Sequence, residues 1–122
     1  RMRHMGVLYS LLLADVVCFV FPLPETDYAL NIYWVFGIVL DYDVIFDARD
    51  SMARLGDMGI GSRPFFWPMH EQPVFRKMGL FSNERYPVAE RIARRGFYIP
   101  SGIALTEEQI SSAATAVRSI LA

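Results

Sequence analysis

The chain has 122 residues, of which 53% are hydrophobic and 20% charged, and its formal net charge is −1. This composition is that of one globular domain, and it excludes the concentrated basic surface that nucleic acids and anionic membranes bind. A single cysteine, Cys18, excludes an intrachain disulfide, and its apolar surroundings are typical of a buried, unreactive thiol.

The first half of the chain alternates predicted helices and strands. Residues 2–13 form a predicted amphipathic helix, and the β-branched and aromatic run 16–21 predicts a strand. After a polar loop, the nearly continuous apolar run 32–40 predicts a strand that is buried on both faces. Asp47 is expected to cap the next helix, which stops at Gly59.

The second half begins with residues 60–66, which predict a second buried strand. Pro64 moves the far end of this strand to a sheet edge or an exit loop, because proline has no backbone N–H to donate. Pro73 is expected to start a short helical turn. Residues 84–95 predict a helix with Pro87 in its first turn, where a proline is tolerated.

The last elements complete the predicted fold. Residues 97–100 are short and extended, and Thr106 and Gln109 have the spacing of a capping box at the start of a final helix. The order of elements predicts an α/β fold of two layers, in which a small sheet of three or four strands carries helices packed mainly on one face. We expect one domain over residues 1–122.

Membrane insertion is not expected. The most apolar segment, residues 7–23, is interrupted by Asp15 and ended by Pro22. Its uninterrupted stretches are shorter than the roughly 20 residues that a membrane-spanning helix needs. We therefore expect a cytoplasmic protein that binds neither membranes nor nucleic acid.

One segment carries more chemistry than packing requires. Residues 59–73 combine two glycines, three prolines and three aromatic residues with Arg63 and His70, directly after a predicted strand. Loops that leave strand ends are common places for binding sites. Arg63 offers a planar fork for phosphate or carboxylate, Trp67 a flat face for a sugar ring or base, and His70 a hydrogen-bonding ring. An aromatic loop that only packs under the sheet is the alternative, and it stays open.

Metal ligands and a basic binding face are weaker readings. His4 and His70 with a single cysteine do not make a metal-ligand set, so no metal site is expected. A helix that carries Arg91, Arg94 and Arg95 is typical of a solvated face.

Six short blocks in order give a more specific signal than any one of them. They are Asn31-Ile-Tyr33-Trp34, Gly59-Ile-Gly-Ser-Arg63-Pro-Phe-Phe66, Trp67-Pro-Met-His70-Glu-Gln-Pro73, Tyr86-Pro-Val-Ala-Glu90, Ile99-Pro-Ser101 and Leu105-Thr-Glu-Glu-Gln109. Their order and spacing over residues 1–122 resemble the DegT/StrS-type family of nucleotide-sugar aminotransferases, most closely its perosamine-synthase-type members.

The resemblance implies the C-terminal small domain of a fold type I enzyme that depends on pyridoxal phosphate. Such enzymes transfer an amino group from glutamate to a keto nucleotide-sugar, and a lysine of their large domain binds the cofactor. The only lysine here, Lys77, does not match the setting of that lysine. We therefore expect that the large domain is absent, that this chain holds no catalytic or cofactor-binding residue, and that it is inactive alone. A chain that begins with Arg1 fits a fragment.

By resemblance, His70 and Trp67 are the best candidates for contact with the sugar substrate. Arg63 follows, as an anchor for phosphate or carboxylate or as a structural ion-pair partner. Tyr33 and Asn31 are further candidates, and the alternative for both is a strand start that satisfies its own backbone.

The expected partners are the large domain of the same enzyme, a nucleotide-sugar, glutamate, and a second subunit of a homodimeric parent. A second hypothesis is a stand-alone, non-catalytic module that binds a small ligand or dimerises.

Overall fold

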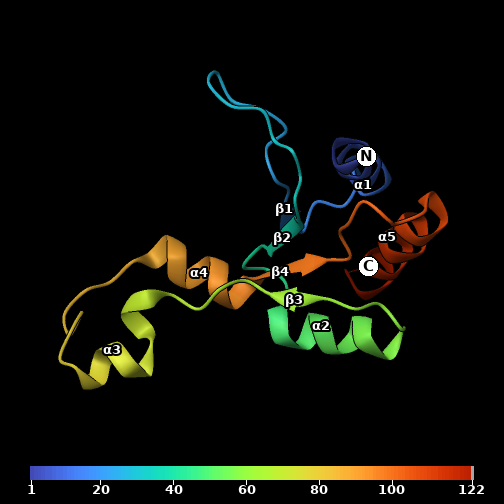
Figure 1. Ribbon diagram of the computed structural model, residues 1–122. Helices are drawn as coiled ribbons and strands as arrows, with labels where there is room; N and C mark the ends of the chain where they lie inside the picture. Colours follow the sequence, from blue (N-terminus) through green and yellow to red (C-terminus); the bar gives the residue numbers. More distant parts are fainter. Residues whose placement is uncertain (122) are drawn as a thin grey trace.

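The structure is a computed structural model that describes residues 1–121. Within these residues, four short strands form one antiparallel sheet in the order β1-β2-β4-β3 (Figure 1). The strands are β1 (Phe19–Val20), β2 (Phe36–Leu40), β3 (Arg63–Pro64) and β4 (Gly96–Ile99). This arrangement confirms the predicted α/β fold with a small sheet, at the upper end of the predicted strand number.

Helices connect and flank the strands, and two of them begin at a cap that the sequence predicts. In the described part of the chain they are α1 (Met2–Leu12), α2 (Ala48–Asp57), the 3₁₀ helix η1 (Met69–Glu71), α3 (Pro73–Lys77), α4 (Pro87–Arg95) and α5 (Glu107–Leu121). The Asp47 carboxylate accepts a hydrogen bond from the Asp50 backbone N–H at 3.0 Å, which confirms the predicted cap of α2. The Thr106–Gln109 capping box is also confirmed, with reciprocal bonds of 3.0 and 3.2 Å.

The core lies on one face of the sheet. Along β2 the side chains of Phe36, Ile38 and Leu40 are fully buried, while the residues between them are partly exposed. Phe97 and Ile99 of β4 lie opposite Ile38 and Phe36, so they join the same face. Apolar side chains of α1, α2 and α5 complete this single core, and α1 and α5 lie side by side (Figure 1).

The opposite face of the sheet is covered at its centre by one aromatic ring. A Cβ atom at Gly37 would lie 2.6 Å from Cζ of Phe65, and one at Gly96 would overlap the same ring. The two glycines therefore leave the space that the Phe65 ring occupies. Tyr98 packs against Phe65 edge-on, with the ring centroids 4.4 Å apart.

Two segments project away from the sheet. The connection between β1 and β2 is a long hairpin, pinned by a bridge between Glu25 and Leu30 (Figure 1). The connection between β3 and α4 forms an arm, residues 65–86, which carries η1 and α3. The arm extends away from the side of the molecule where α1 and α5 lie (Figure 1).

Several predicted boundaries need correction. The strand predicted over 32–40 begins only at Phe36, because Tyr33 has a φ of 54° and its ring packs on the backbone of Gly6. The prediction of a buried strand over 60–66 is wrong. Only Arg63 and Pro64 pair with β4, at the sheet edge, and both are exposed.

Two further elements are shorter than predicted. The strand predicted over 16–21 is reduced to Phe19–Val20, and the helix predicted over 84–95 begins at Pro87, its first helical residue. None of the helices within residues 1–121 is long and apolar enough to cross a membrane.

Candidate functional site

The arm residues around η1 are bound to α4 by a guanidinium. Arg94 donates to both carboxylate oxygens of Glu71, at 2.8 and 2.9 Å. The same guanidinium carbon lies 4.8 Å from the centroid of the Trp67 ring. An ion pair in which Nη2 of Arg94 reaches both oxygens of Glu71, together with a cation–π contact of the same guanidinium, restricts both partners. One face of the Trp67 indole is thereby held by the protein, while the side chain stays 46% exposed.

His70 is part of η1 on the arm, and it is only 5% exposed. Its Nε2 atom is 3.0 Å from Oε1 of Glu90, and the ring of Tyr86 packs against it with the centroids 4.9 Å apart. Glu90 also accepts hydrogen bonds from the Tyr86 backbone N–H at 3.1 Å and from Nε of Arg85 at 3.3 Å. These donors, the Tyr86 N–H first and His70 next, lower the pKa of Glu90 to about 2. Glu90 is therefore ionised at neutral pH.

Arg63 lies in a different setting, at the edge strand β3. It lines a groove of about 660 Å³ together with Gly61, Tyr98 and Ser101. Within residues 1–121 its guanidinium makes no ion pair, because the ion pairs found there involve other cations. The groove therefore offers an exposed fork of N–H donors to an anion.

Asn31 and Tyr33 build the base of the β1–β2 hairpin. The Asn31 side chain accepts from the Tyr33 backbone N–H at 2.7 Å and donates to the Leu23 carbonyl at 2.9 Å. Tyr33 is 4% exposed and stacks on Phe36 with the ring centroids 6.0 Å apart. This is the backbone-satisfying arrangement that the sequence left open, and contact of either residue with a substrate stays a prediction.

The sheet order separates these candidates into groups. Trp67 and His70 share the arm and are both bound to α4, while Arg63 lies on β3 just before the arm begins. The hairpin base with Asn31 and Tyr33 belongs to the β1–β2 edge, at the opposite end of the sheet from β3. The structure therefore brings His70 and Trp67 together and leaves the hairpin residues apart.

The partners on α4 were missed by sequence reasoning. The three arginines of this helix are not a solvated face: Arg91 binds Asp41 at 3.1 Å, Arg94 binds Glu71, and Arg95 donates to backbone carbonyls of the β2–α2 connection. The only available signal for Glu90 was its place in the Tyr86-Pro-Val-Ala-Glu90 block, which does not identify the group that it binds.

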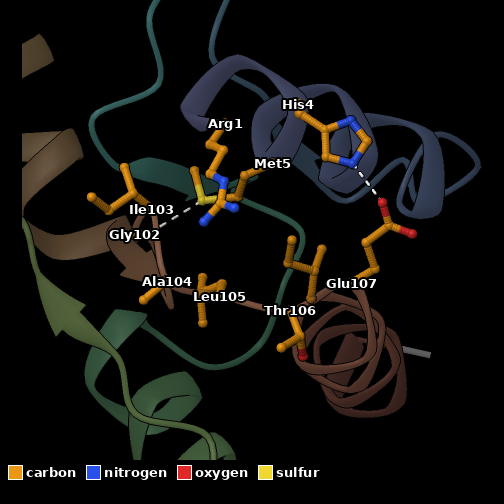
Figure 2. Close-up of a pocket in the computed structure, with 10 residues that line it drawn as sticks. Arg1, His4, Met5, Gly102, Ile103, Ala104, Leu105, Thr106 and Glu107 are labelled. Atoms are coloured by element: carbon orange, nitrogen blue, oxygen red, sulfur yellow. Dashed lines mark hydrogen bonds and ion pairs between the residues drawn. The ribbon is translucent and has the colours of Figure 1, made fainter.

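Another hollow carries none of the predicted site residues. It measures about 330 Å³ and lies between the first turn of α1 and the segment that leads into α5 (Figure 2). At its rim, Nε2 of His4 is 2.7 Å from Oε1 of Glu107. The pair is exposed, so it marks a surface contact between two helices.

Metal binding is not favoured by the arm. Ligand atoms of His70, Glu71 and Glu90 lie within 4.8 Å of one another. Both carboxylates, however, are already paired with guanidinium groups, Glu71 with Arg94 and Glu90 with Arg85. A metal ion would have to displace these guanidinium groups from the carboxylate oxygens in order to bind them.

The fold is shared with solved aminotransferases. PseC of Helicobacter pylori, an aminotransferase involved in the biosynthesis of pseudoaminic acid, matches 98% of this chain and 32% of its own chain at a TM-score of 0.84 and 15% identity. DesV of S. venezuelae, solved in complex with a ketimine intermediate, matches 98% of this chain and 31% of its own at a TM-score of 0.82 and 22% identity.

Sequence relatives agree with the fold. GDP-perosamine synthase of Vibrio cholerae is 26% identical over 94 residues, which are 77% of this chain and 25% of that enzyme. The chain thus spans about a quarter of the length of this curated relative. The model of the DegT/DnrJ/EryC1/StrS aminotransferase family matches residues 1–118. Since this match covers nearly the whole sequence, the chain belongs to the DegT/DnrJ/EryC1/StrS aminotransferase family.

Proposed function

We propose that this chain is the C-terminal domain of an aminotransferase that transfers an amino group from glutamate to a keto nucleotide-sugar of the perosamine type, for cell-surface polysaccharides or antibiotics. The observation that carries the proposal is the family match over residues 1–118. Its similarity to GDP-perosamine synthase over a quarter of that enzyme supports a role as one domain of a larger protein.

This chain does not provide the residue that binds pyridoxal phosphate, the cofactor of this family. The cofactor needs an enclosed lysine amine, but the only lysine here, Lys77, ends the short helix α3 and is exposed. In the proposed enzyme the cofactor and its lysine belong to the large domain. This chain then contributes to the substrate side of the cleft.

Two features of the chain suit a nucleotide-sugar. The guanidinium of Arg63 lies in an open groove and suits a phosphate of the nucleotide, or alternatively the carboxylate of glutamate. The exposed face of Trp67 suits a sugar ring or a base, and the contact with Arg94 holds the indole in place before the ligand arrives. His70 completes this set as a hydrogen-bonding group on the same arm.

The coding sequence immediately upstream of Arg1 tests the proposal. We expect it to encode a large domain with the cofactor lysine, and the enzyme expressed from the whole reading frame to aminate a keto nucleotide-sugar with glutamate as donor. A stop codon or an unrelated domain directly before Arg1 would refute the catalytic assignment.

Substitution of Arg63 then tests the anion anchor. We expect Arg63→Ala to raise the KM for the nucleotide-sugar about 10- to 100-fold, the effect of losing a hydrogen bond to a charged group. Arg49→Ala, which removes an exposed arginine of α2, is the matched control and should leave KM unchanged. An unchanged KM in Arg63→Ala would remove Arg63 from the substrate site.

The second candidate function is a stand-alone module that binds a small ligand or dimerises. The exposed apolar side chains of the projecting segments favour association: Tyr28 and Trp34 of the hairpin are 86% and 64% exposed, and Phe66 of the arm is 81% exposed. Titration of the 122-residue chain with nucleotide-sugars, followed by the fluorescence of Trp34 and Trp67, separates the two functions. Saturable binding without a large domain supports the module, whereas weak or absent binding supports the aminotransferase domain.

A further inference from the structure

The two histidines of the chain form two histidine–glutamate pairs that differ in solvent exposure. His4 and Glu107 are 2.7 Å apart, and their side chains are 64% and 73% exposed. His70 and Glu90 are 3.0 Å apart, and their side chains are only 6% and 14% exposed. Water competes for every hydrogen bond of the first pair, whereas the second pair is largely shielded. The geometry of the second pair can therefore fix where the His70 proton resides.

The bond between His70 and Glu90 determines which ring nitrogen carries the proton. Glu90 receives three donors and is ionised at neutral pH, as its pKa of about 2 shows. An ionised carboxylate can only accept hydrogen bonds, so Nε2 of His70 must donate. In a neutral imidazole with the proton on Nε2, the free lone pair lies on Nδ1.

The charges around the ring are balanced in pairs. Glu90 is bound by Arg85, and both carboxylate oxygens of Glu71 are bound by Nη2 of Arg94. Arg76 donates to the His70 carbonyl at 3.3 Å, and Glu84 accepts from the Tyr86 hydroxyl. The three carboxylates and three guanidinium groups in contact with this cluster therefore sum to zero. Tyr86 contributes an aromatic edge to the ring and a backbone N–H to Glu90, and adds no charge of its own at neutral pH.

The Nδ1 atom has no partner in the described part of the chain. Only Nε2 of the ring forms a hydrogen bond within residues 1–121. The fully shielded side-chain atoms without a partner in those residues are Nε of Arg91 and Nε of Arg95, and Nδ1 of His70 is not among them. This nitrogen therefore keeps contact with solvent and has its acceptor lone pair free.

We propose that Glu90 is a positioning residue, which holds His70 in the Nε2–H tautomer so that Nδ1 accepts a hydrogen bond from a hydroxyl group of the sugar substrate. The assignment of the donor to a sugar rests on the proposed function. A phosphate oxygen is an acceptor, as Nδ1 is, so the two would repel each other. His70 on the arm therefore recognises a neutral donor group. The guanidinium of Arg63 then binds the anionic part of the substrate.

The tautomer is tested directly on the 122-residue chain by NMR. We expect the ¹⁵N–¹H correlations of His70 to show a proton on Nε2 that exchanges slowly with water, and none on Nδ1. His4 serves as the internal control, and its exposed Nε2 proton should exchange rapidly. A proton on Nδ1 of His70 would overturn the proposal from the wild-type spectrum alone.

Two matched variants test the role of the carboxylate. Glu90→Gln replaces the obligate acceptor with an amide that can also donate, so we expect it to abolish the single tautomer and the slow exchange at His70. Glu107→Gln makes the same change beside His4 and should leave the His70 signals unchanged. Identical His70 signals in wild type and Glu90→Gln would show that Glu90 does not set the tautomer.

The recognised group is tested in the enzyme expressed from the whole reading frame. Nucleotide-sugars in which single hydroxyl groups are replaced by fluorine, which cannot donate, are compared as substrates. For one position we expect kcat/KM to fall about 10- to 100-fold in the wild type, and this penalty to disappear in Glu90→Gln. Equal penalties in both proteins at every position would overturn the contact. Absence of amino transfer in the wild type would instead refute the proposed function, while the NMR result still decides the role of Glu90.

Discussion

A methyl group at position 96 tests how tightly Phe65 is packed on the sheet. In Gly96→Ala the new Cβ overlaps the Phe65 ring and lies 2.5 Å from the carbonyl oxygen of Ile92, which belongs to the backbone of α4. In Gly37→Ala the only close neighbour is the far edge of the same ring, at 2.6 Å. Overpacking costs about 1–3 kcal/mol. We expect Gly96→Ala at the upper end of this range, because a backbone atom cannot rotate away, and Gly37→Ala at the lower end.

Urea denaturation of the chain, followed by circular dichroism, measures both costs. In a Phe65→Ala background we expect Gly37→Ala to lose its penalty, whereas Gly96→Ala keeps the part that is due to the Ile92 carbonyl. Gly61→Ala, where a Cβ meets nothing within 4 Å, is the control and should change the free energy of unfolding by less than about 0.5 kcal/mol. A Gly96→Ala protein as stable as wild type would refute the packing argument.

Three further predictions follow from single side chains. Arg95→Met should destabilise the chain by about 3 kcal/mol, because three carbonyls of residues 41–46 lose a donor worth about 1 kcal/mol each, and Arg95→Lys should not restore it, as urea midpoints would show. Folding lowers the pKa of Glu90 from 4.5 to about 2. Ionised Glu90 therefore stabilises the folded chain fully above pH 4.5, and this stabilisation is lost as the pH falls toward 2. Acid titration monitored by circular dichroism should therefore be shallower over that window in Glu90→Gln. Burial raises the pKa of Tyr9 to about 12, so the folded chain keeps the neutral phenol. The stabilisation that the neutral phenol gives the fold is therefore lost as the pH rises from 10 toward 12. Tyr9→Phe should weaken this alkaline loss, and it should cost about 1 kcal/mol at neutral pH, because the Pro100 carbonyl loses its donor.

Features that depend on a few neighbouring residues were predictable from the sequence. The caps at Asp47 and Thr106 are confirmed because each bond joins residues three apart. The fold class is confirmed because hydrophobic periodicity reports which face of an element is buried. Pro87 at the first position of α4 follows from the same local chemistry.

Features that depend on distant residues were not predictable. The late start of β2 is due to Tyr33, whose ring lies on Gly6, 27 positions earlier in the sequence numbering. The shortness of β3 could not be predicted from the apolar composition of residues 60–66. The ring of Phe65 packs against two glycines of β2 and β4, and the pairing of β3 with β4 ends before it.

The sequence predicts which segment carries the candidate residues, but not which residues of other elements they contact. Residue types singled out the segment that carries His70 and Trp67, whereas their partners Glu90 and Arg94 come from α4. Only the folded arm brings them together. The substrate contacts themselves stay predictions.

The single lysine and the single cysteine make this chain suitable for dual labelling without mutation. Lys77 ends α3 on the projecting arm, whereas Cys18 lies beside β1, with its Sγ 3.9 Å from the Leu121 carbonyl at the end of α5. Cys18 is partly exposed in the structure, which departs from the buried thiol expected from the sequence, so a thiol-reactive dye would report on the sheet. An amine-reactive dye would report on the arm once the terminal amine of Arg1 is blocked. Burial raises the pKa of the Cys18 thiol, so the thiol step calls for mildly alkaline buffer. Energy transfer between the two dyes would then follow any movement of the arm as ligands or partner domains are added.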